Sequence, residues 1–371
     1  MMVRILLILF SLSGGVDPVS NGGFVQAAGL WEASIFAGTG KKGFSGDGGQ
    51  ATAALLNNPY GLVRGPDDAF YVCDIDNHVI RRIGRDGVIS SVVGNGTKGY
   101  AGDGGLAIRA TLNQPYEIRF DGTGNMFIVE MPNHVIRRVD ATTNTISTIA
   151  GVGVAGFSGD GGEAVVAKLS RPHSIQFSPD GLGLFICDIG NHRVRRIDLS
   201  SGVIDTFVGD GKKRRTPDGV HFSGQSVNGP RASDFDASGD LWLALREGNA
   251  IYRLDMPTQT FHHEGGTGAK GFTGNGGPAR EATLSGPKGI AVGPDGDVYF
   301  ADTESHTIRF LDRSQGTIEL LLGTGFRGDA FSKDPLRCET NRPHGIFVDG
   351  DGSVYVGDSE NHRIIRIRKI D

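Results

Sequence analysis

The chain carries one motif six times, and this repetition constrains its fold more than any other feature. The first copy is the segment 74–83, Asp-Ile-Asp-Asn-His-Val-Ile-Arg-Arg-Ile, in a sequence of 371 residues. The copies align on a marker position at His78, His134, His192, Ala250, His306 and His362, with intervals of 56, 58, 58, 56 and 56 residues. A fixed period of this length predicts an array of like structural units. Features that recur in every unit are therefore expected to be structural, and function is expected where the units differ.

One unit, residues 59–94, has the pattern of four short strands joined by tight turns. The expected strands are 60–64, 69–73, 78–83 and 88–93, and the turns between them are rich in Gly, Pro, Asp and Asn. Val, Ile and Phe occupy both faces of these strands, which suits sheets covered by a neighbour on each side. No useful length of sequence has helical periodicity. The sequence therefore predicts an all-β, six-bladed β-propeller.

The two ends of the repeat array predict how the ring closes. The last unit contains three strands and ends its third at about Arg368, whereas residues 31–37 form an extra strand before the first complete unit. The sequence of this extra strand, Ser-Ile-Phe-Ala-Gly at 34–38, matches a fourth-strand sequence, Ser-Thr-Ile-Ala-Gly at 147–151. We expect the N-terminal strand to complete the C-terminal blade, because this removes two free sheet edges.

The repeated unit resembles the NHL repeat, which is named for an Asn-His-Leu-like signature. The pairs that carry the resemblance are Asn77-His78, Asn133-His134, Asn191-His192 and Asn361-His362. A glycine-rich insertion, Gly-Phe-Ser-Gly-Asp-Gly-Gly at 43–49, is similar to that of exported bacterial NHL proteins and of teneurin propellers. The resemblance covers about residues 31–371 and implies the fold. It does not imply one function, because the family includes peptide-amidating lyases, sensor domains, RNA-binding proteins and adhesion modules.

The glycine-rich segments match a dinucleotide-binding pattern in their glycine spacing but not in their structural context. Gly38-x-Gly40-x-x-Gly43 has the spacing of that pattern, but the pattern occurs five times in the same repeat position with no long helix after it. We interpret these segments as loops between blades, each held by a buried aromatic residue. Three copies carry one acidic residue, Asp47, Asp103 or Asp160, and the copy at 271–277 has Asn275 instead, so a calcium site is an alternative interpretation.

Charge and cysteine content exclude some classes of protein. The net charge is −5 and the isoelectric point is about 6.1, which does not support a nucleic-acid-binding surface. The one strongly basic run, Lys212–Arg215, is interpreted as a solvated loop. The three cysteines, Cys73, Cys187 and Cys338, are expected to be free thiols.

The N-terminal segment is similar to an export signal. Arg4 precedes the apolar stretch 5–12, and Val25-Gln26-Ala27 is an acceptable cleavage site. We expect a signal peptide at 1–27 and a propeller at 28–371, exported to the periplasm or the extracellular space. A misassigned start codon is the alternative. The apolar stretch is too short to span a bilayer, and no partner subunit is expected.

The units differ most at the start of the inner strand, just after a proline that we term the leading proline. Here the units present different polar and aromatic side chains that converge on the mouth of the central channel. The candidate binding residues are Tyr60, Tyr116, Glu117, His173, Arg231, Lys288 and His344. Because Arg231 and Lys288 can hold a carboxylate, this ring predicts a site for a protein or a small anionic ligand.

Two strand starts raise an enzymatic alternative. Arg171-Pro172-His173 and Arg342-Pro343-His344 are similar to the segments that supply zinc ligands in peptide-amidating lyases. That family uses three such His residues, whereas only two occur here, so the set is incomplete unless Glu117 completes it. The first interpretation is a ligand-binding or protein-interaction module. The alternative is a channel-mouth enzyme, either a metal-dependent lyase or a gluconolactonase-type hydrolase, with no catalytic residue or cofactor assigned.

The fourth unit departs most from the others. It lacks the marker His, and its loop 212–229 has lost the glycine motif. Either a partner binds at this blade or its sequence has drifted without a functional cause.

Overall fold

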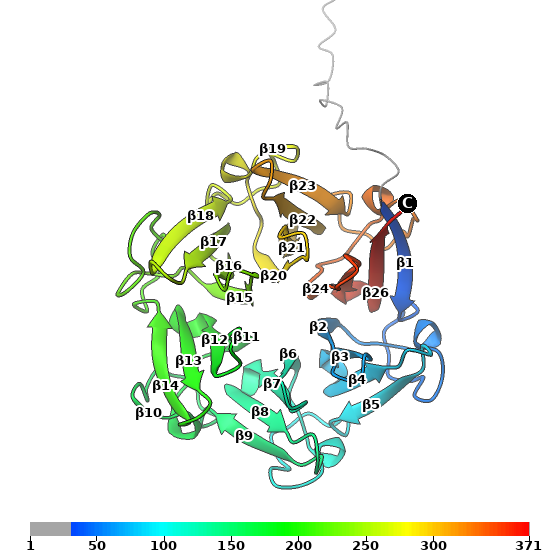
Figure 1. The fold of residues 1–371 in the computed structure, drawn as a ribbon. Helices are drawn as coiled ribbons and strands as arrows, with labels where there is room; N and C mark the ends of the chain where they lie inside the picture. The colour runs from blue at the N-terminus through cyan, green and yellow to red at the C-terminus, as the bar shows by residue number, and fades with distance from the viewer. Residues whose placement is uncertain (1–30, 371) are drawn as a thin grey trace, which may run out of the picture.

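The computed structural model describes residues 31–370, which form six antiparallel sheets arranged as blades around a central channel (Figure 1). This confirms the predicted six-bladed β-propeller. The expected signal peptide lies outside the described residues. No helix among the described residues is long and apolar enough to cross a membrane.

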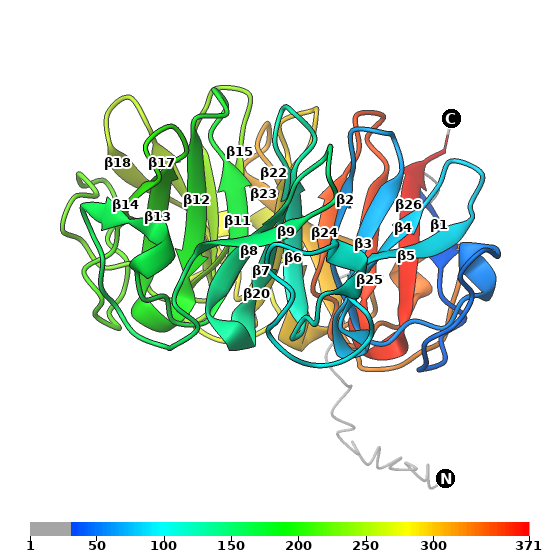
Figure 2. The ribbon, with the colours of Figure 1, turned by 90° about the horizontal axis from the view of Figure 1, so that it is seen from below.

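Each blade runs from an inner strand at the channel to an outer strand at the rim (Figure 1). Seen edge-on, the strands run between the two ends of the ring (Figure 2). Blade 1 contains β2 (Pro59–Arg64), β3 (Phe70–Asp74), β4 (Val79–Ile83) and β5 (Ile89–Val93), and blade 2 contains β6 (Pro115–Phe120), β7 (Met126–Glu130), β8 (Val135–Val139) and β9 (Ile146–Ala150). Blade 3 contains β11 (Pro172–Phe177), β12 (Gly183–Asp188), β13 (Arg193–Asp198), β14 (Val203–Val208) and the short β10 (Gly162–Glu163). Blade 4 contains β15 (Pro230–Phe235), β16 (Leu241–Leu245), β17 (Ala250–Asp255) and β18 (Thr260–Gly265).

The last two blades follow the same order. Blade 5 contains β20 (Pro287–Val292), β21 (Val298–Asp302), β22 (Thr307–Asp312), β23 (Thr317–Leu322) and the short β19 (Gly277–Pro278). Blade 6 contains β24 (Ile346–Val348), β25 (Val354–Asp358), β26 (Arg363–Lys369) and β1 (Trp31–Ala37). The predicted closure is confirmed, because β1 pairs antiparallel with β26 from Trp31↔Lys369 to Ala37↔Ile364.

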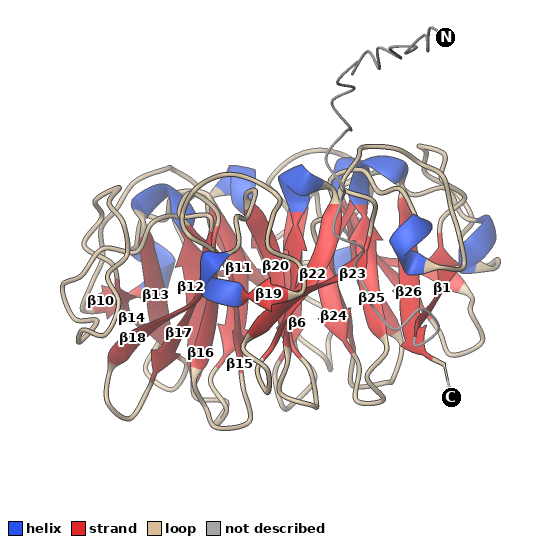
Figure 3. Cartoon of the chain, turned by 90° about the horizontal axis from the view of Figure 1, so that it is seen from above, coloured by secondary structure: helices blue, strands red, loops and turns tan. Residues whose placement is uncertain are grey.

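The short 3-10 helices gather mainly at one end of the ring (Figure 3). Five of them join the second and third strands of a blade: Ile75–Asn77, Met131–Asn133, Ile189–Asn191, Thr303–Ser305 and Ser359–Asn361. We term the segment at this position the end turn of each blade. The inner strands also begin at this end, since Pro59 of β2 pairs with Asp74 at the end of β3. The end turns therefore surround the channel mouth that holds the candidate residues.

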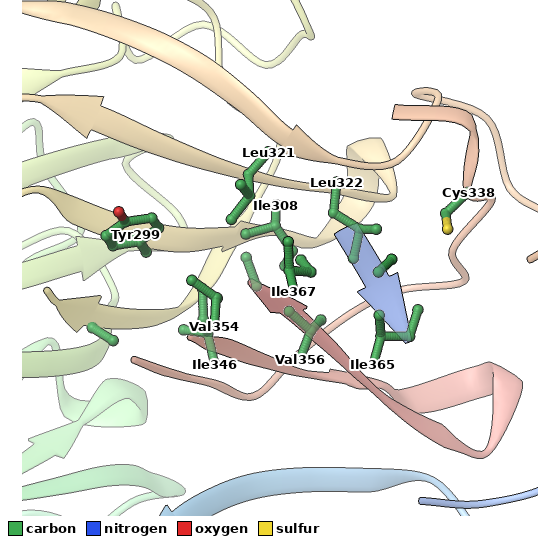
Figure 4. Packing of buried hydrophobic residues seen from close by; sticks show 13 residues of the cluster. Tyr299, Ile308, Leu321, Leu322, Cys338, Ile346, Val354, Val356, Ile365 and Ile367 are labelled. Carbon is green, nitrogen blue, oxygen red and sulfur yellow. The ribbon is translucent and has the colours of Figure 1, made fainter. Parts of the chain in front are cut away.

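Apolar packing between blades makes up the core. Between blades 5 and 6, Ile308 and Leu322 pack with Val356, Ile365 and Ile367, and each of these is at most 2% exposed (Figure 4). Five further clusters of this kind occur around the ring. Blades covered on both faces explain why the strands are apolar on both sides.

The marker residues link each blade to the next one. His78 has a left-handed backbone (φ 57°), and its Nδ1 accepts a hydrogen bond of 3.2 Å from the backbone N–H of Gln114, which precedes a leading proline. His134, His192, His306 and His362 make the equivalent bond, at 3.0–3.2 Å. The expected structural role of the Asn-His pairs agrees with this geometry.

The alignment of the fourth unit at Ala250 is wrong by one residue. In blade 4 the left-handed residue is Asn249 (φ 44°), and its Oδ1 accepts the equivalent bond from Gly286 N at 3.0 Å. Pro230 pairs with Leu245 as Pro59 pairs with Asp74. Leu245 therefore replaces the buried acid of the other blades. With Asn249 as the marker, the intervals from His192 to Asn249 and from Asn249 to His306 are both 57 residues.

Ion pairs, rather than buried aromatics, hold the glycine-rich loops of the first three blades. In blade 1 the fully buried Arg81 lies 3.2 Å from Asp74 and 2.7 Å from Asp47 of the loop. The loop aromatic Phe44 is 47% exposed, so the expectation of a buried aromatic is wrong. Blades 2 and 3 repeat the Arg–loop pair with Arg137–Asp103 and Arg195–Asp160. The loop carboxylate is thus already engaged, which disfavours the calcium alternative.

The cysteine prediction is confirmed: Cys73, Cys187 and Cys338 are free and buried.

Candidate ligand-binding site

The candidate residues lie together at the channel mouth, each at the start of an inner strand or, for His344, two residues before it. The residue before each leading proline is left-handed, from Gln114 at φ 47° to Gly229 at φ 70°, and its N–H is held by the marker residue of the preceding blade. A register irregularity follows the leading proline in the inner strands of blades 1 to 5. The backbone thereby directs the next side chain toward the channel axis.

The channel is filled at this level by the candidate side chains themselves. Six of the seven line a central cavity of about 20 Å³: Tyr60, Tyr116, Glu117, Arg231, Lys288 and His344. The ring of His344 stacks on Tyr60 at 3.9 Å, and Tyr60 meets Tyr116 edge to face at 4.9 Å. A cavity of this size holds about one water molecule, so it is too small for an organic ligand.

Burial shapes the electrostatics of the ring. Lys288 Nζ lies 3.0 Å from His344 Nε2 and 3.1 Å from Glu304 Oε1. Burial, reinforced by the charge of Arg231, lowers the pKa of Lys288 to about 7. Burial also holds the pKa of His344 well below its usual value and raises the pKa of Glu117. Although Glu304 favours the charged form of Lys288, burial is the larger effect on this amine.

The seventh candidate, His173, lies in the wall of a separate and larger pocket of about 250 Å³, which we term the blade 3 pocket. Its lining residues are Arg171, His173, Ile189, Gly190, His192, Lys213, Arg246 and Glu247. His173 Nδ1 donates to the Arg171 carbonyl at 2.7 Å, and burial holds the pKa of His173 well below its usual value. Arg171, Lys213 and Arg246 were not among the site residues expected from the sequence.

The blade 3 pocket has more positive than negative charge. Three cationic side chains face one carboxylate, that of Glu247, which pairs with Arg246 at 2.7 Å. Arg171 and Lys213 are exposed, and neither has an ion-pair partner within residues 31–370. Two unpaired cations in one pocket can hold a carboxylate or phosphate group. The prediction of a purely solvated loop at Lys212–Arg215 thus omitted the role of Lys213 in lining a pocket.

The end turns explain which residues before the leading prolines are neutralised. The second residue of an end turn contacts two residues that each precede a leading proline, one in its own blade and one in the next blade. Asp76 accepts from Asn58 Nδ2 at 3.1 Å and from Gln114 Nε2 at 2.8 Å. Arg342 is held in the same way by Glu360 at 3.1 Å and Glu304 at 3.0 Å.

Arg171 lacks such partners because of the residues at the two equivalent positions. In blade 3 the second residue of the end turn is Gly190, and in blade 2 it is Pro132. Neither residue carries a carboxylate, so the guanidinium of Arg171 stays free to bind an anion.

Blade 4 contributes an adjoining pocket of about 230 Å³, which we term the blade 4 pocket. It is lined by Arg215, Thr216, Asn228, Leu245, Glu247, Gly248, Ala250, Tyr252, His263, Gly266, Thr267 and Gly268. By strand pairing, Leu245, Ala250 and Tyr252 replace Asp74, Val79 and Arg81 of blade 1, so less polar side chains stand where the other blades carry a buried ion pair. Glu247 belongs to both pockets, and its Oε2 is buried without a hydrogen-bond partner among the described residues.

The histidines of the two strand starts do not meet. His344 contacts Tyr60, Tyr60 contacts Tyr116, and Tyr116 contacts His173, so two tyrosine rings separate the imidazoles. Among residues 31–370, no group of three or more His, Cys, Asp or Glu side chains could hold a metal ion. The combination of both histidines with Glu117 is therefore not assembled. The enzymatic alternative stays a prediction.

Comparison with known proteins identifies repeats of one family and proteins with the same fold. The family model of the teneurin NHL domain matches residues 266–342, and that of the NHL repeat matches residues 340–367. Protein SUPPRESSOR OF QUENCHING 1, chloroplastic, of Arabidopsis thaliana is 26% identical over 271 residues, which cover 69% of this chain and 25% of that protein. NHL repeat-containing protein 2 of Homo sapiens is 23% identical over 324 residues, which cover 80% of this chain and 44% of that protein.

A solved structure supports the fold. The crystal structure of an auxiliary nutrient binding protein from Bacteroides thetaiotaomicron aligns with a TM-score of 0.67 and 18% identity, over 92% of this chain and 77% of that one. At this identity the similarity shows the fold alone. The chain spans less than half the length of the two curated relatives above.

Proposed function

This chain belongs to the NHL-repeat β-propellers, and we propose that it is an exported ligand-binding module that takes a carboxylate-bearing ligand at the blade 3 pocket. The observation that carries the proposal is the unpaired charge of Arg171 and Lys213 in a pocket of about 250 Å³. The auxiliary nutrient binding protein of the same fold supports a binding role.

The two pockets together indicate which kind of carboxylate fits. The carboxylate of the ligand lies against Arg171 and Lys213, and a ligand N–H donates to the unpaired Oε2 of Glu247. An apolar group then enters the blade 4 pocket beside Leu245 and Ala250. A carboxylate, an N–H group and an apolar substituent on one small framework describe an N-acylated apolar amino acid or the C-terminus of a peptide.

Calorimetric titration with N-acetyl-L-phenylalanine tests this proposal. The expected result is saturable binding that weakens at least about tenfold for N-acetyl-L-phenylalanine amide, which lacks the carboxylate. The double variant Arg171→Met/Lys213→Met should show the same loss. Lys98→Met/Arg109→Met removes two exposed cations from another loop and should bind as the parent does.

Two results would contradict the proposal. Equal affinity for the acid and the amide would show that the carboxylate is not recognised. Equal affinity of the parent and the Arg171→Met/Lys213→Met variant would place the ligand elsewhere on the propeller.

A further inference from the structure

The central cavity inside the ring of candidate residues is lined by one cation, Arg231, that has no direct ion-pair or hydrogen-bond partner among the described residues. Three cations line it: Arg119, Arg231 and Lys288. Arg119 pairs with Glu117 at 2.5 Å, and Lys288 pairs with Glu304 at 3.1 Å. The remaining cation, Arg231, forms no ion pair, and its side chain donates no hydrogen bond to any residue that the structure describes.

Arg231 is also almost completely withdrawn from solvent. Its exposed fraction is 5%, and its guanidinium carbon lies 5.4 Å from the centre of the Tyr116 ring. Burying an unpaired charge is costly, because the interior does not replace the hydration that the charge loses. The contact with the face of Tyr116 recovers only part of this cost. The charge of Glu117 also favours the charged guanidinium, but no acceptor among residues 31–370 contacts it directly. A small buried anion beside Arg231 would supply that direct partner.

The size of the cavity restricts the anion to a single atom. A free volume of about 20 Å³ corresponds to one species of about the size of water, and the cavity cannot hold a carboxylate or a phosphate group. The side chains of Tyr60 and Tyr116 border the same cavity as potential hydroxyl donors, and Ile290 and Ile346 form apolar walls. Polar donors together with apolar walls suit a weakly hydrated halide.

We propose that the central cavity binds one chloride ion, held by Arg231. This site is distinct from the blade 3 pocket, because none of the residues that line one cavity lines the other. The ion would give the guanidinium of Arg231 a direct partner and stabilise the contacts among the six inner strands. Its binding does not depend on the organic ligand proposed above.

Thermal unfolding at constant ionic strength tests the chloride site. The full-length protein is melted in sodium gluconate to which sodium chloride is added in exchange, from zero to 150 mM. The expected result is a saturable rise in Tm of about 2 °C or more, since a ligand that binds only the folded state stabilises it. Sodium bromide should act similarly, and Arg171→Met should keep the effect because Arg171 lies outside the cavity.

The variant Arg231→Met should lose the halide-dependent rise, because an apolar side chain replaces the unpaired charge. Crystals grown with bromide should show an anomalous peak between Arg231 and Lys288, a result that needs no variant. Identical Tm values in chloride and gluconate, together with no bromide peak, would overturn the proposal. That outcome leaves the binding of N-acetyl-L-phenylalanine unaffected, so the two proposals fail separately.

Discussion

Two strand starts share the sequence Arg-Pro-His but differ in their electrostatics. At the start of blade 6, Arg342 lies between Glu304 and Glu360, and His344 is packed into the central ring. At the start of blade 3, Arg171 has no carboxylate beside it, and His173 lines an open pocket. The difference arises from two residues outside the motif, Pro132 and Gly190. A strand start becomes available to a ligand when the neighbouring end turns do not neutralise it.

The first prediction contrasts a buried, paired arginine with the free one. Arg137→Met should lower the free energy of unfolding by about 3–5 kcal/mol, because it leaves the buried carboxylate of Glu130 without its cation. Arg171→Met should change it by about 0.5 kcal/mol or less, as for an ordinary surface position. Urea unfolding of both variants provides the measurement. Similar losses in the two variants would remove the distinction between structural and free arginines.

The second prediction concerns Lys288, which shares Glu304 with Arg342. Its pKa is about 7 in the folded protein against a usual 10.5, so the unfolded chain binds more protons above pH 7. The contribution of Lys288 to stability should therefore rise with pH, by up to about 1.4 kcal/mol per pH unit.

Comparison of the parent with Lys288→Met isolates this contribution. The stability difference between them should change by about 2 kcal/mol from pH 7 to 8.5 in favour of the parent. Titrating groups that do not contact Lys288 are common to both proteins and cancel in the difference. Glu304 and His344 do contact Lys288, but the pKa of each lies below its usual value and thus outside the range from pH 7 to 8.5. A difference independent of pH would mean that Lys288 keeps its usual pKa.

The third prediction converts the blade 3 start into a copy of the blade 6 start. Pro132→Glu places a carboxylate at the position that Glu304 occupies in blade 5, where it should pair with Arg171. Affinity for N-acetyl-L-phenylalanine should fall about tenfold, which corresponds to about 1.4 kcal/mol. Pro132→Gln is the matched control without the charge, and it should bind nearly as the parent does. Equal effects of Glu and Gln would attribute the loss to the backbone rather than to charge.

The sequence predicted the features that depend on repetition. The blade count, the closure by β1 and the clustering of the strand starts follow from a pattern that recurs every 56 to 58 residues. The alignment failed at Ala250 because blade 4 replaces the marker His with Asn249, and only the strand pairing and the bond to Gly286 reveal the equivalence. A one-residue shift in the alignment of the repeats cannot be detected from the sequence when the residue that marks the register has changed.

The two pockets could not be predicted because they depend on contacts between different blades. Arg171 is free owing to Pro132, which lies 39 residues earlier in the chain, and to Gly190 in its own end turn. Whether a polar residue at a strand start is exposed also depends on how closely the side chains of the six blades pack in the central channel. Six of the seven candidates surround a cavity of about 20 Å³ instead of an open mouth. Side-chain packing on this scale is not encoded in the identity of any single position.

Hydrogen–deuterium exchange with and without N-acetyl-L-phenylalanine most directly tests the claim that only one of the two matching strand starts is available to a ligand. We expect the ligand to slow exchange in the segments around Arg171, Lys213 and residues 245–250, which border the blade 3 and blade 4 pockets. The segment 338–344, which contains the neutralised Arg342, should exchange at the same rate in both samples. Protection at 338–344 without protection around Arg171 would contradict the account.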